Sequence, residues 1–319
     1  MIARARVVVT ECWDPYRNLA MEDALLTGLP ADEAILFLWQ NRHTVVIGAG
    51  QNAWQECNTQ LLEAEGGTLA RRASGGGAVY HDLGNLNFSF LVPRADYDVA
   101  RQLSVISNAV RALGVRAETT GRNDVTVGGR KFSGNAFRLL DASALHHGTL
   151  MVSVDMDRLT RYLTVDPEKL KAKGVKSVRA RVANLSEFAP VTVESLRGAM
   201  IGAFSELYGP VRIADADEAV PEGFEESYAR HRSWEWNYGR SPRGSLRLTK
   251  RFDWGSVTLT GEIVSGALAD VRVFTDAMDE TLAPRLEAAL GGCAWQSGAL
   301  AAAVRALGIP DLESWLSKV

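Results

Sequence analysis

A glycine-rich run is the most informative feature of the sequence. Residues 71–82 read Arg-Arg-Ala-Ser-Gly-Gly-Gly-Ala-Val-Tyr-His-Asp. Glycines leave backbone N–H groups open to a carboxylate or a phosphate, and Arg71 and Arg72 add two permanently charged forks for the same anion. The run lacks the Gly-Lys-Ser/Thr end of a P-loop and the Gly-x-Gly-x-x-Gly spacing of a dinucleotide fold. We expect an anion-binding loop of another kind; the alternative is a tight turn with solvated arginines.

A second pair of charged residues follows the loop. The residues between Asp124 and Lys131 predict a hairpin that turns at Gly128-Gly129, which places the two side chains on facing strands. A lysine beside an anion loop would neutralise charge that builds up on a carboxylate or an α-phosphate. Asp124 would help to hold Mg²⁺, which prefers carboxylate and phosphate oxygens. The alternative is an exposed ion pair that contributes about 0–1 kcal/mol.

Other candidate residues each have an ordinary structural alternative. His146 and His147 are adjacent on a predicted strand, so they face opposite sides and do not chelate one metal; one would line a pocket while the other faces out. Cys57 is the cysteine nearest these motifs, but a lone cysteine is more often a small buried residue than a nucleophile. Trp39 shares an apolar strand face with Phe37 and is either pocket wall or plain core.

Composition limits the class of protein. The chain has 319 residues, a net charge of −3 and 46% hydrophobic residues, which suits about two globular domains and argues against general nucleic-acid binding. Cys12, Cys57 and Cys293 form no disulfide framework, so we expect a reducing cytoplasm. The N-terminal apolar run is too short for a signal peptide, and no stretch approaches the ~20 residues that span a bilayer.

The pattern of elements predicts an α+β fold. A capped helix runs from Asp14-Pro15 to Gly28, and apolar spacings of three and four predict another over 99–113. Further helices are expected at 156–163 and 192–208, and strands at 35–39, 44–48, 68–72, 78–81, 85–92, 125–127, 131–139 and 147–155. Because the first half is rich in hairpins, we expect a mixed or antiparallel sheet rather than a doubly wound one.

A small second domain is expected after a linker at 239–245, which divides the chain into 1–240 and 246–319. Strands at 256–263 and 267–274, helices near 280–290 and 297–307, and a last turn at 311–318 predict a β-β-α-α unit.

Taken together, these segments resemble lipoate–protein ligase A of the two-domain bacterial type, in the biotin/lipoate protein ligase family. Arg-Arg-x-Ser-Gly-Gly-Gly-Ala-Val, Gly-Arg-Asn-Asp and Lys-x-Ser-Gly occur here in one order, and the likeness covers nearly the whole chain. It implies a mixed, largely antiparallel sheet flanked by helices, with a small C-terminal α+β domain. It also implies that residues 1–240 form the catalytic domain.

The resemblance implies a two-step reaction. Small members of the family are often monomeric, so we expect a monomer, although nothing in the sequence fixes the oligomeric state; the composition described above predicts a cytoplasmic protein with no nucleic-acid or membrane partner. Lipoate and ATP, with Mg²⁺, give lipoyl-AMP and pyrophosphate, and the lipoyl group then passes to a lysine of a carrier domain. The carriers would be the acyltransferase subunits of 2-oxoacid dehydrogenase complexes and the glycine-cleavage carrier protein.

The same resemblance assigns residues. Lys131 would be catalytic, between the lipoyl carbonyl oxygen and the α-phosphate, and Asp124 would contact the metal. ATP and adenylate would be bound by Arg72, Gly76, Gly77, Ala78, Val79, Tyr80, Asn85, Asp124 and Lys131. Lipoate would be bound by Glu22, Trp39, Arg72, Ser74, Val79, Lys131, Leu145, His147 and Thr149. The basic segment 168–186 would fold over bound adenylate.

Two other functions stay open at this point. The same fold hosts octanoyl or lipoyl transferases, which need a nucleophilic cysteine, and Cys57 would have to serve. A non-catalytic lipoate-binding protein would be expected to lack Lys131 or Asp124, and both are present.

Overall fold

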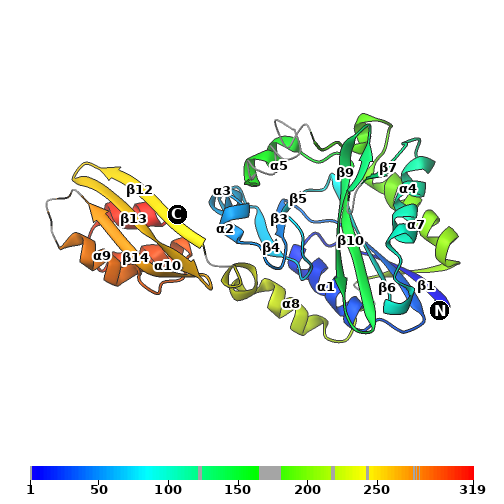
Figure 1. Ribbon diagram of the computed structural model, residues 1–319, viewed down its shortest axis with the longest axis horizontal. Helices are drawn as coiled ribbons and strands as arrows, with labels where there is room; N and C mark the ends of the chain where they lie inside the picture. The colour runs from blue at the N-terminus through cyan, green and yellow to red at the C-terminus, as the bar shows by residue number, and fades with distance from the viewer. Residues whose placement is uncertain are drawn as a thin grey trace. The chain divides into compact units, whose positions relative to one another are not determined.

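The computed structural model describes residues 2–120, 124–164, 181–216, 220–241, 244–275, 277, 279 and 281–319. Their contacts divide the chain into two compact units (Figure 1). The first comprises Met1–Ala49 and Glu56–Ser233, and the second comprises Gly50–Gln55 and Trp234–Val319. The assignment of 1–240 and 246–319 as functional domains stays a prediction.

A large mixed sheet forms the centre of the first unit. Within the described residues it has eight strands in the order β11-β1-β2-β6-β10-β9-β8-β7. The strands are β1 (Arg4–Val9), β2 (Glu33–Trp39), β6 (Asn85–Pro93), β7 (Glu118–Thr120), β8 (Asp124–Val127), β9 (Arg130–Leu139), β10 (Ser143–Met151) and β11 (Val211–Asp215). β1 runs parallel to β2 and β11, and the other neighbours are antiparallel. The predicted α+β class with a largely antiparallel sheet is confirmed.

Helices cover both faces of this sheet (Figure 1). On one face lie α4 (Val99–Ala112) and α7 (Val193–Tyr208), whose apolar sides join the buried core of β2 and β6. On the other lies α1 (Pro15–Thr27), which begins at its Asp14 cap as predicted and packs on Phe37 and Leu145. α8 (Phe224–Arg232) packs beside α1.

A small sheet on the α1 side carries the glycine loop. It contains β3 (Thr44–Ile47), β4 (Thr68–Arg71) and β5 (Val79–His81) in the order β4-β3-β5. The loop leaves β4 and returns as β5 on the far side of β3, so it must cross the end of β3. The predicted strands 35–39 and 44–48 therefore exist but belong to different sheets. Short helices α2 (Ala53–Glu56), α3 (Thr59–Ala64) and α5 (Met156–Tyr162) lie in the neighbouring connections.

Several predicted boundaries were wrong for physical reasons. The strand predicted at 147–155 is β10, which starts at Ser143 and ends at Met151, because Ser143–His146 pair with β6 despite their weak alternation. β1 and β11 were not predicted, since their partners lie far away in the sequence. Single short turns η1 (Arg94–Asp96) and η2 (Leu185–Glu187) complete the described elements of this unit.

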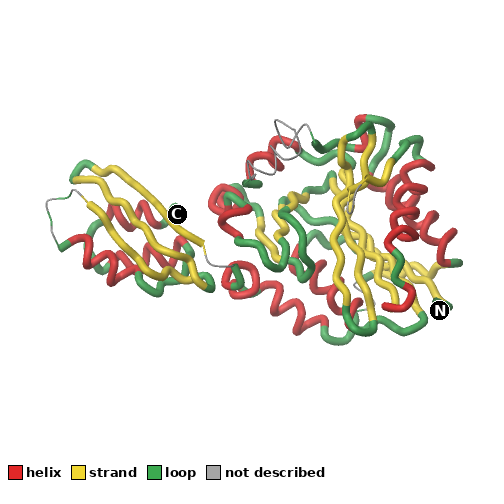
Figure 2. Tube along the Cα trace, viewed as in Figure 1, coloured by secondary structure: helices red, strands yellow, loops and turns green. Residues whose placement is uncertain are grey.

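The second unit has its own apolar core, and its strands and helices are seen in Figure 2. It contains η3 (Glu235–Gly239), β12 (Gly244–Phe252), β13 (Gly255–Val264), β14 (Ala267–Thr275), α9 (Leu282–Leu290), α10 (Ser297–Arg305) and α11 (Pro310–Leu316). The three strands form one antiparallel sheet. β12 was not predicted, and the expected last turn is the helix α11, which buries Leu312 and Leu316.

Candidate active site

A pocket of about 150 Å³ opens on the α1 side of the large sheet. β2, β6, β9 and β10 form its floor, and the glycine loop and α1 form its walls. Its lining residues are Leu19, Trp39, Val46, Arg72, Gly76, Gly77, Ala78, Val79, His81, Asn87, Lys131, Gly134, Asn135, Ala136, His147, Gly148 and Thr149. The structure thus brings together residues from segments up to 130 positions apart, most of them apolar with a few polar groups, as small-molecule sites require.

The ammonium group of Lys131 lies at this pocket. Its Nζ is 2.6 Å from Oδ1 of Asp124 across the hairpin, and each side chain is about one third exposed, at 33% and 31%. The side chain lies over Gly134, where an added Cβ would come within 2.9 Å of Nζ. The predicted facing of Asp124 and Lys131 and the turn at Gly128-Gly129 are confirmed.

The backbone of Lys131 is held by the segment that follows residues 165–180, which lie outside the described residues. Its N–H donates to the Arg181 carbonyl at 2.8 Å, and its carbonyl accepts from the Ala183 N–H at 2.9 Å. The end of the basic segment 168–186 is therefore joined directly to the strand of the pocket lysine. Its predicted closure over adenylate stays a prediction.

Arg72 holds the glycine loop from below. It is buried: Nη2 donates to the carbonyls of Gly75 and Gly77 at 2.7 and 2.8 Å, and Nε donates to Ser74 Oγ at 3.1 Å. Burial lowers the pKa of Arg72 to about 10, partly offset by the charge of Glu22, so the guanidinium stays protonated at neutral pH. In a trans peptide the C=O and the following N–H point in opposite directions. Because the carbonyls of Gly75 and Gly77 point toward Arg72, the N–H groups of residues 76 and 78 point away from it.

Gly76 adopts φ +94°, a conformation that side-chain-bearing residues rarely adopt, so the sharp turn of this loop depends on glycine. Arg71, by contrast, does not face the same anion as Arg72. It is fully buried and donates to the carbonyls of Gly48 and Ala49, because adjacent strand residues point to opposite sides. The prediction that both arginines face one anion is therefore wrong. Arg72 lines the pocket, whereas Arg71 stabilises the end of β3 through its hydrogen bonds.

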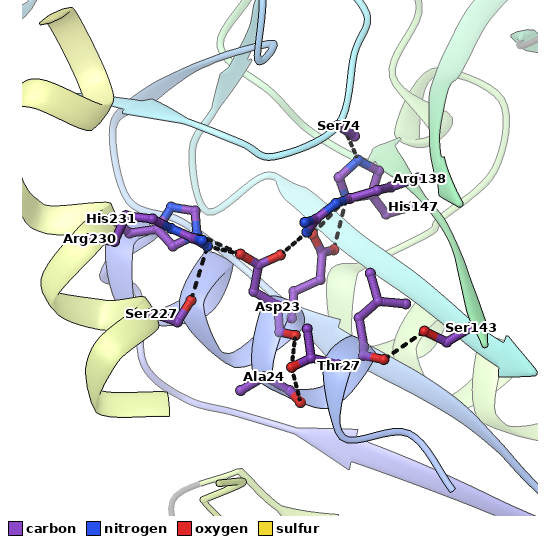
Figure 3. A network of polar contacts seen from close by, with 12 residues as sticks. Asp23, Ala24, Thr27, Ser74, Arg138, Ser143, His147, Ser227, Arg230 and His231 are labelled. Atoms are coloured by element: carbon purple, nitrogen blue, oxygen red, sulfur yellow. Dashed lines mark hydrogen bonds and ion pairs between the residues drawn. The ribbon is translucent and has the colours of Figure 1, made fainter. Parts of the chain in front are cut away.

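A chain of buried polar contacts links several of the pocket residues, and Figure 3 shows the contact between its members His147 and Ser74. Nε2 of His147 lies 2.6 Å from Ser74 Oγ, and its Nδ1 lies 2.8 Å from Oε1 of Glu22. A carboxylate only accepts, so Nδ1 carries a proton. Glu22 also accepts from Ser89 Oγ, which in turn accepts from the indole N–H of Trp39 at 3.0 Å. Every member from Trp39 to Arg72 is thus fixed by its neighbour, which orients the pocket walls.

The other histidine does not face out as predicted. His146 is fully buried on the opposite face of β10, where its ring nitrogens lie 3.0 Å from Gln102 Oε1 and 2.8 Å from Asn135 Oδ1. Burial, with a smaller contribution from His147, lowers the pKa of His146 to about 3, so it is neutral. It supports the floor strand from behind.

Some predicted site residues lie near the pocket without lining it. Tyr80 points away, because Val79 and His81 occupy the pocket side of β5, and it packs between His43 and Tyr162. Glu22, Ser74, Asn85, Asp124 and Leu145 are also absent from the lining residues. Leu145 belongs to the core under α1, and Asn85 donates to Asn87. Sequence reasoning missed the lining residues His81 and Asn87, although each lies two positions from a residue that it did predict, Val79 and Asn85.

With this geometry described, comparison with known proteins identifies the family. The sequence model of the lipoyl protein ligase A/B catalytic domain matches residues 14–205, and that of the bacterial lipoate protein ligase C-terminus matches residues 241–313. The chain belongs to the lipoate–protein ligase family.

Solved structures of ligases resemble this chain. P. falciparum LipL1, in complex with lipoate, is 29% identical with a TM-score of 0.66, and the match covers 99% of this chain and 100% of that one. A bipartite lipoate protein ligase from Thermoplasma acidophilum, described with its E2 lipoyl domain, is 31% identical over 75% of this chain and 98% of its own, with a TM-score of 0.66. A lipoate-protein ligase A bound with ATP is 28% identical over 75% and 100%, with a TM-score of 0.65.

No cysteine is placed for a thiolate mechanism in the part of the chain that the structure describes. Cys57 is buried and lies outside the pocket lining, next to Leu163. Burial raises the pKa of the Cys57 thiol to about 12, with a smaller contribution from Glu63, so it is not a thiolate at neutral pH. Cys12 and Cys293 do not line the pocket either.

Cys57→Ser is expected to leave lipoate transfer within about twofold of the wild type, because the thiol contacts no pocket group. Mass spectrometry of a modified lipoyl domain measures this directly. Loss of modification in a folded Cys57→Ser protein would restore the cysteine transferase as the better explanation.

The described residues would fit a magnesium ion only together with phosphate oxygens from a ligand. No group of three or more His, Cys, Asp or Glu side chains able to hold a metal occurs among the described residues. Asp124 offers one partly exposed carboxylate beside the pocket, and Mg²⁺ commonly uses one or two carboxylates plus phosphate oxygens.

None of the helices in the described ranges has the length and apolarity that a membrane crossing requires.

Proposed function

We propose that this chain is an ATP-dependent lipoate–protein ligase. It joins lipoate to AMP with release of pyrophosphate and then transfers the lipoyl group to a lysine of apo-lipoyl domains. The carriers in this proposal are the acyltransferase subunits of 2-oxoacid dehydrogenase complexes and the glycine-cleavage carrier protein, and the enzyme acts as a cytoplasmic monomer. The relatives bound to lipoate, to ATP and described with a lipoyl domain support these assignments.

One observation carries the proposal. The Lys131 ammonium shares a single pocket with the glycine loop on one side and the apolar wall of Trp39 and Val79 on the other. A carboxylate and a triphosphate repel one another, so joining them requires a fixed positive charge at the meeting point. A long apolar acid requires a dry, apolar channel that leads away from that charge. Both requirements meet at Lys131.

In the first step, a carboxylate oxygen of lipoate attacks the α-phosphorus and the bond to pyrophosphate breaks. Lys131 stabilises the charge that develops on both reacting groups, and it does so more in the transition state than in the separated substrates. The N–H groups that Arg72 directs away from itself, at residues 76 and 78, hold phosphate oxygens. Asp124 would help to hold Mg²⁺ together with the phosphates, and the ion would supply positive charge for the leaving group.

In the second step, the amine of the carrier lysine attacks the lipoyl carbonyl carbon, AMP leaves and the amine loses a proton. The same ammonium group of Lys131 stabilises the carbonyl oxygen. Water must stay out, since it would hydrolyse the mixed anhydride. The buried Glu22–His147–Ser74 chain keeps the inner wall rigid and its polar groups paired.

The proposal is tested by incubating the full chain with a purified apo-lipoyl domain and lipoate, with and without MgATP. Mass spectrometry should show a lipoyl adduct on the target lysine only when ATP is present, together with AMP and pyrophosphate. Modification without ATP from an acyl carrier would indicate a transferase. Tight lipoate binding with no adduct under any condition would indicate a binding protein.

A further inference from the structure

The pocket floor forms a row that starts at the lysine. On β9, Gly134 lies under the Lys131 side chain and its N–H lies 3.3 Å from Thr149 Oγ1 on β10. Thr149 is in register with Asn87 on β6, and Asn87 is in register with Trp39 on β2. Neighbouring strands lie about 4.8 Å apart, so Asn87 is roughly 10 Å from the β9 end of the row. An acid whose carboxylate lies at Lys131 therefore brings its tail over Asn87 and Trp39.

This far end of the row is not uniformly apolar. Oδ1 of Asn87 accepts from Asn85 at 2.9 Å, but its Nδ2 has no hydrogen-bond partner within the described ranges, although the residue is 1% exposed. An unpaired amide in a dry pocket weakens any complex in which the ligand also fails to pair with it.

His81 contributes a second unpaired donor to the same pocket. Asn18 Nδ2 reaches backbone carbonyls and Asn41 Oδ1, so Asn41 Nδ2 is the end that donates to His81 Nδ1, 3.2 Å away. A neutral ring that accepts at Nδ1 carries its proton on Nε2. That Nε2 has no partner in the described part of the molecule, and the ring packs edge-on 6.2 Å from Trp39. Burial, with smaller contributions from Arg72 and His147, lowers the pKa of His81 to about 3, which keeps the ring neutral.

We infer that Asn87 and His81 select acids whose tail carries hydrogen-bond acceptors, and that they favour the ring sulfurs of lipoate over an alkyl tail such as that of octanoate. This inference rests on the proposed function and deepens it. A divalent sulfur is a weak acceptor, yet it gives each N–H a partner that a methylene cannot. The indole of Trp39 adds a sulfur–aromatic contact that is independent of these two residues.

The test compares three acids on the full-length protein by calorimetric binding, without ATP. They are lipoate, octanoate and 5-cyclopentylpentanoate, which keeps a five-membered ring but has no sulfur. The wild type should bind lipoate about tenfold more tightly than the cyclopentyl acid, the size of one modest hydrogen bond. Asn87→Leu should reduce this ratio several-fold, mainly by improving the affinity for the two sulfur-free acids, and His81→Phe should act in the same direction.

Ser133→Ala is the matched control, because Ser133 Oγ is also buried without a partner in the described residues but lies outside the pocket lining. Its ratio should equal that of the wild type. Equal affinities for lipoate and the cyclopentyl acid in the wild type would overturn the inference, even if Asn87→Leu does not fold. An unchanged ratio of the affinities for lipoate and the cyclopentyl acid in a folded Asn87→Leu protein would also overturn it.

The measurement separates the inference from the function on which it rests. Acid-dependent ATP–pyrophosphate exchange is measured on the same samples. Selective binding without exchange would refute the ligase proposal and support the selection by Asn87 and His81. ATP–pyrophosphate exchange without selectivity among the acids would support the ligase proposal and refute the selection by Asn87 and His81. If none of the acids binds, the inference is overturned.

Discussion

Lys131→Ala is expected to lower lipoate-dependent ATP–pyrophosphate exchange by at least about 100-fold, the effect of removing one well-placed charge-stabilising donor. Of the two cationic side chains among the described lining residues, Lys131 has the more exposed charge, because the guanidinium of Arg72 is buried against the loop carbonyls. Removal also leaves the Asp124 carboxylate unbalanced beside the incoming anions, which adds repulsion. Lys131→Met keeps the length of the side chain without its charge and should show a similar loss.

The matched control is Arg130→Ala, on the neighbouring residue of the same strand. Arg130 pairs with Glu187 at 2.8 Å, and both side chains are more than one third exposed, so it contributes little to stability and points away from the pocket. Its exchange rate should stay within about twofold of the wild type. Wild-type exchange in Lys131→Ala would remove this residue from the mechanism.

Local signals in the sequence were sufficient for much of the site. The hairpin between Asp124 and Lys131 depends on two adjacent glycines, and the α1 helix depends on its Asp14 cap and the Pro15 that follows. Both are confirmed because neighbouring residues determine them. The pocket faces of β5 and β10 follow from alternation, which explains why His147 and Val79 line the pocket together.

Long-range contacts were beyond such reasoning. The parallel pairing of β1 with β11 joins segments about 200 residues apart, and no turn encodes it. The Glu22–His147 hydrogen bond likewise joins residues 125 positions apart. Sequence reasoning placed both residues at the ligand on resemblance alone, whereas in the structure His147 lines the pocket and Glu22 lies behind it, bonded to His147 and Ser89. The burial of His146 could not be read from alternation, since both faces of this sheet are covered.

A second charged cluster beside this network determines how α1 is held (Figure 3). Asp23 is 5% exposed and pairs with Arg138 on β9 and with Arg230 and His231 on α8. Burial opposes ionisation of this carboxyl, but the hydrogen bond from His231 and the charges of Arg138 and Arg230 outweigh it and hold its pKa below the usual value. Because Asp23 follows Glu22, the cluster also fixes the helix residue that contacts His147.

Asp23→Asn is expected to lower the free energy of unfolding by about 2–4 kcal/mol, because the partly buried Arg138 and Arg230 then lack the buried counter-charge. We place it below the full cost of a broken buried pair, since the Arg230 side chain is 41% exposed and is partly rehydrated. Urea denaturation monitored by circular dichroism measures the change. Asp32→Asn is the matched control, because Asp32 pairs with Arg4 on the surface, where both side chains are about half exposed.

The pH dependence gives an independent check on the same carboxylate. A carboxyl whose folded pKa lies below its unfolded value stabilises the protein above the unfolded pKa, near 4, and this contribution is lost as the pH falls through the folded pKa. The wild type should therefore lose more stability than Asp23→Asn between about pH 4 and pH 2. If the two proteins unfold at the same urea concentration at pH 7 and lose stability in parallel below pH 4, the cluster does not hold α1, and the position of Glu22 must depend on apolar packing and on its hydrogen bonds with His147 and Ser89.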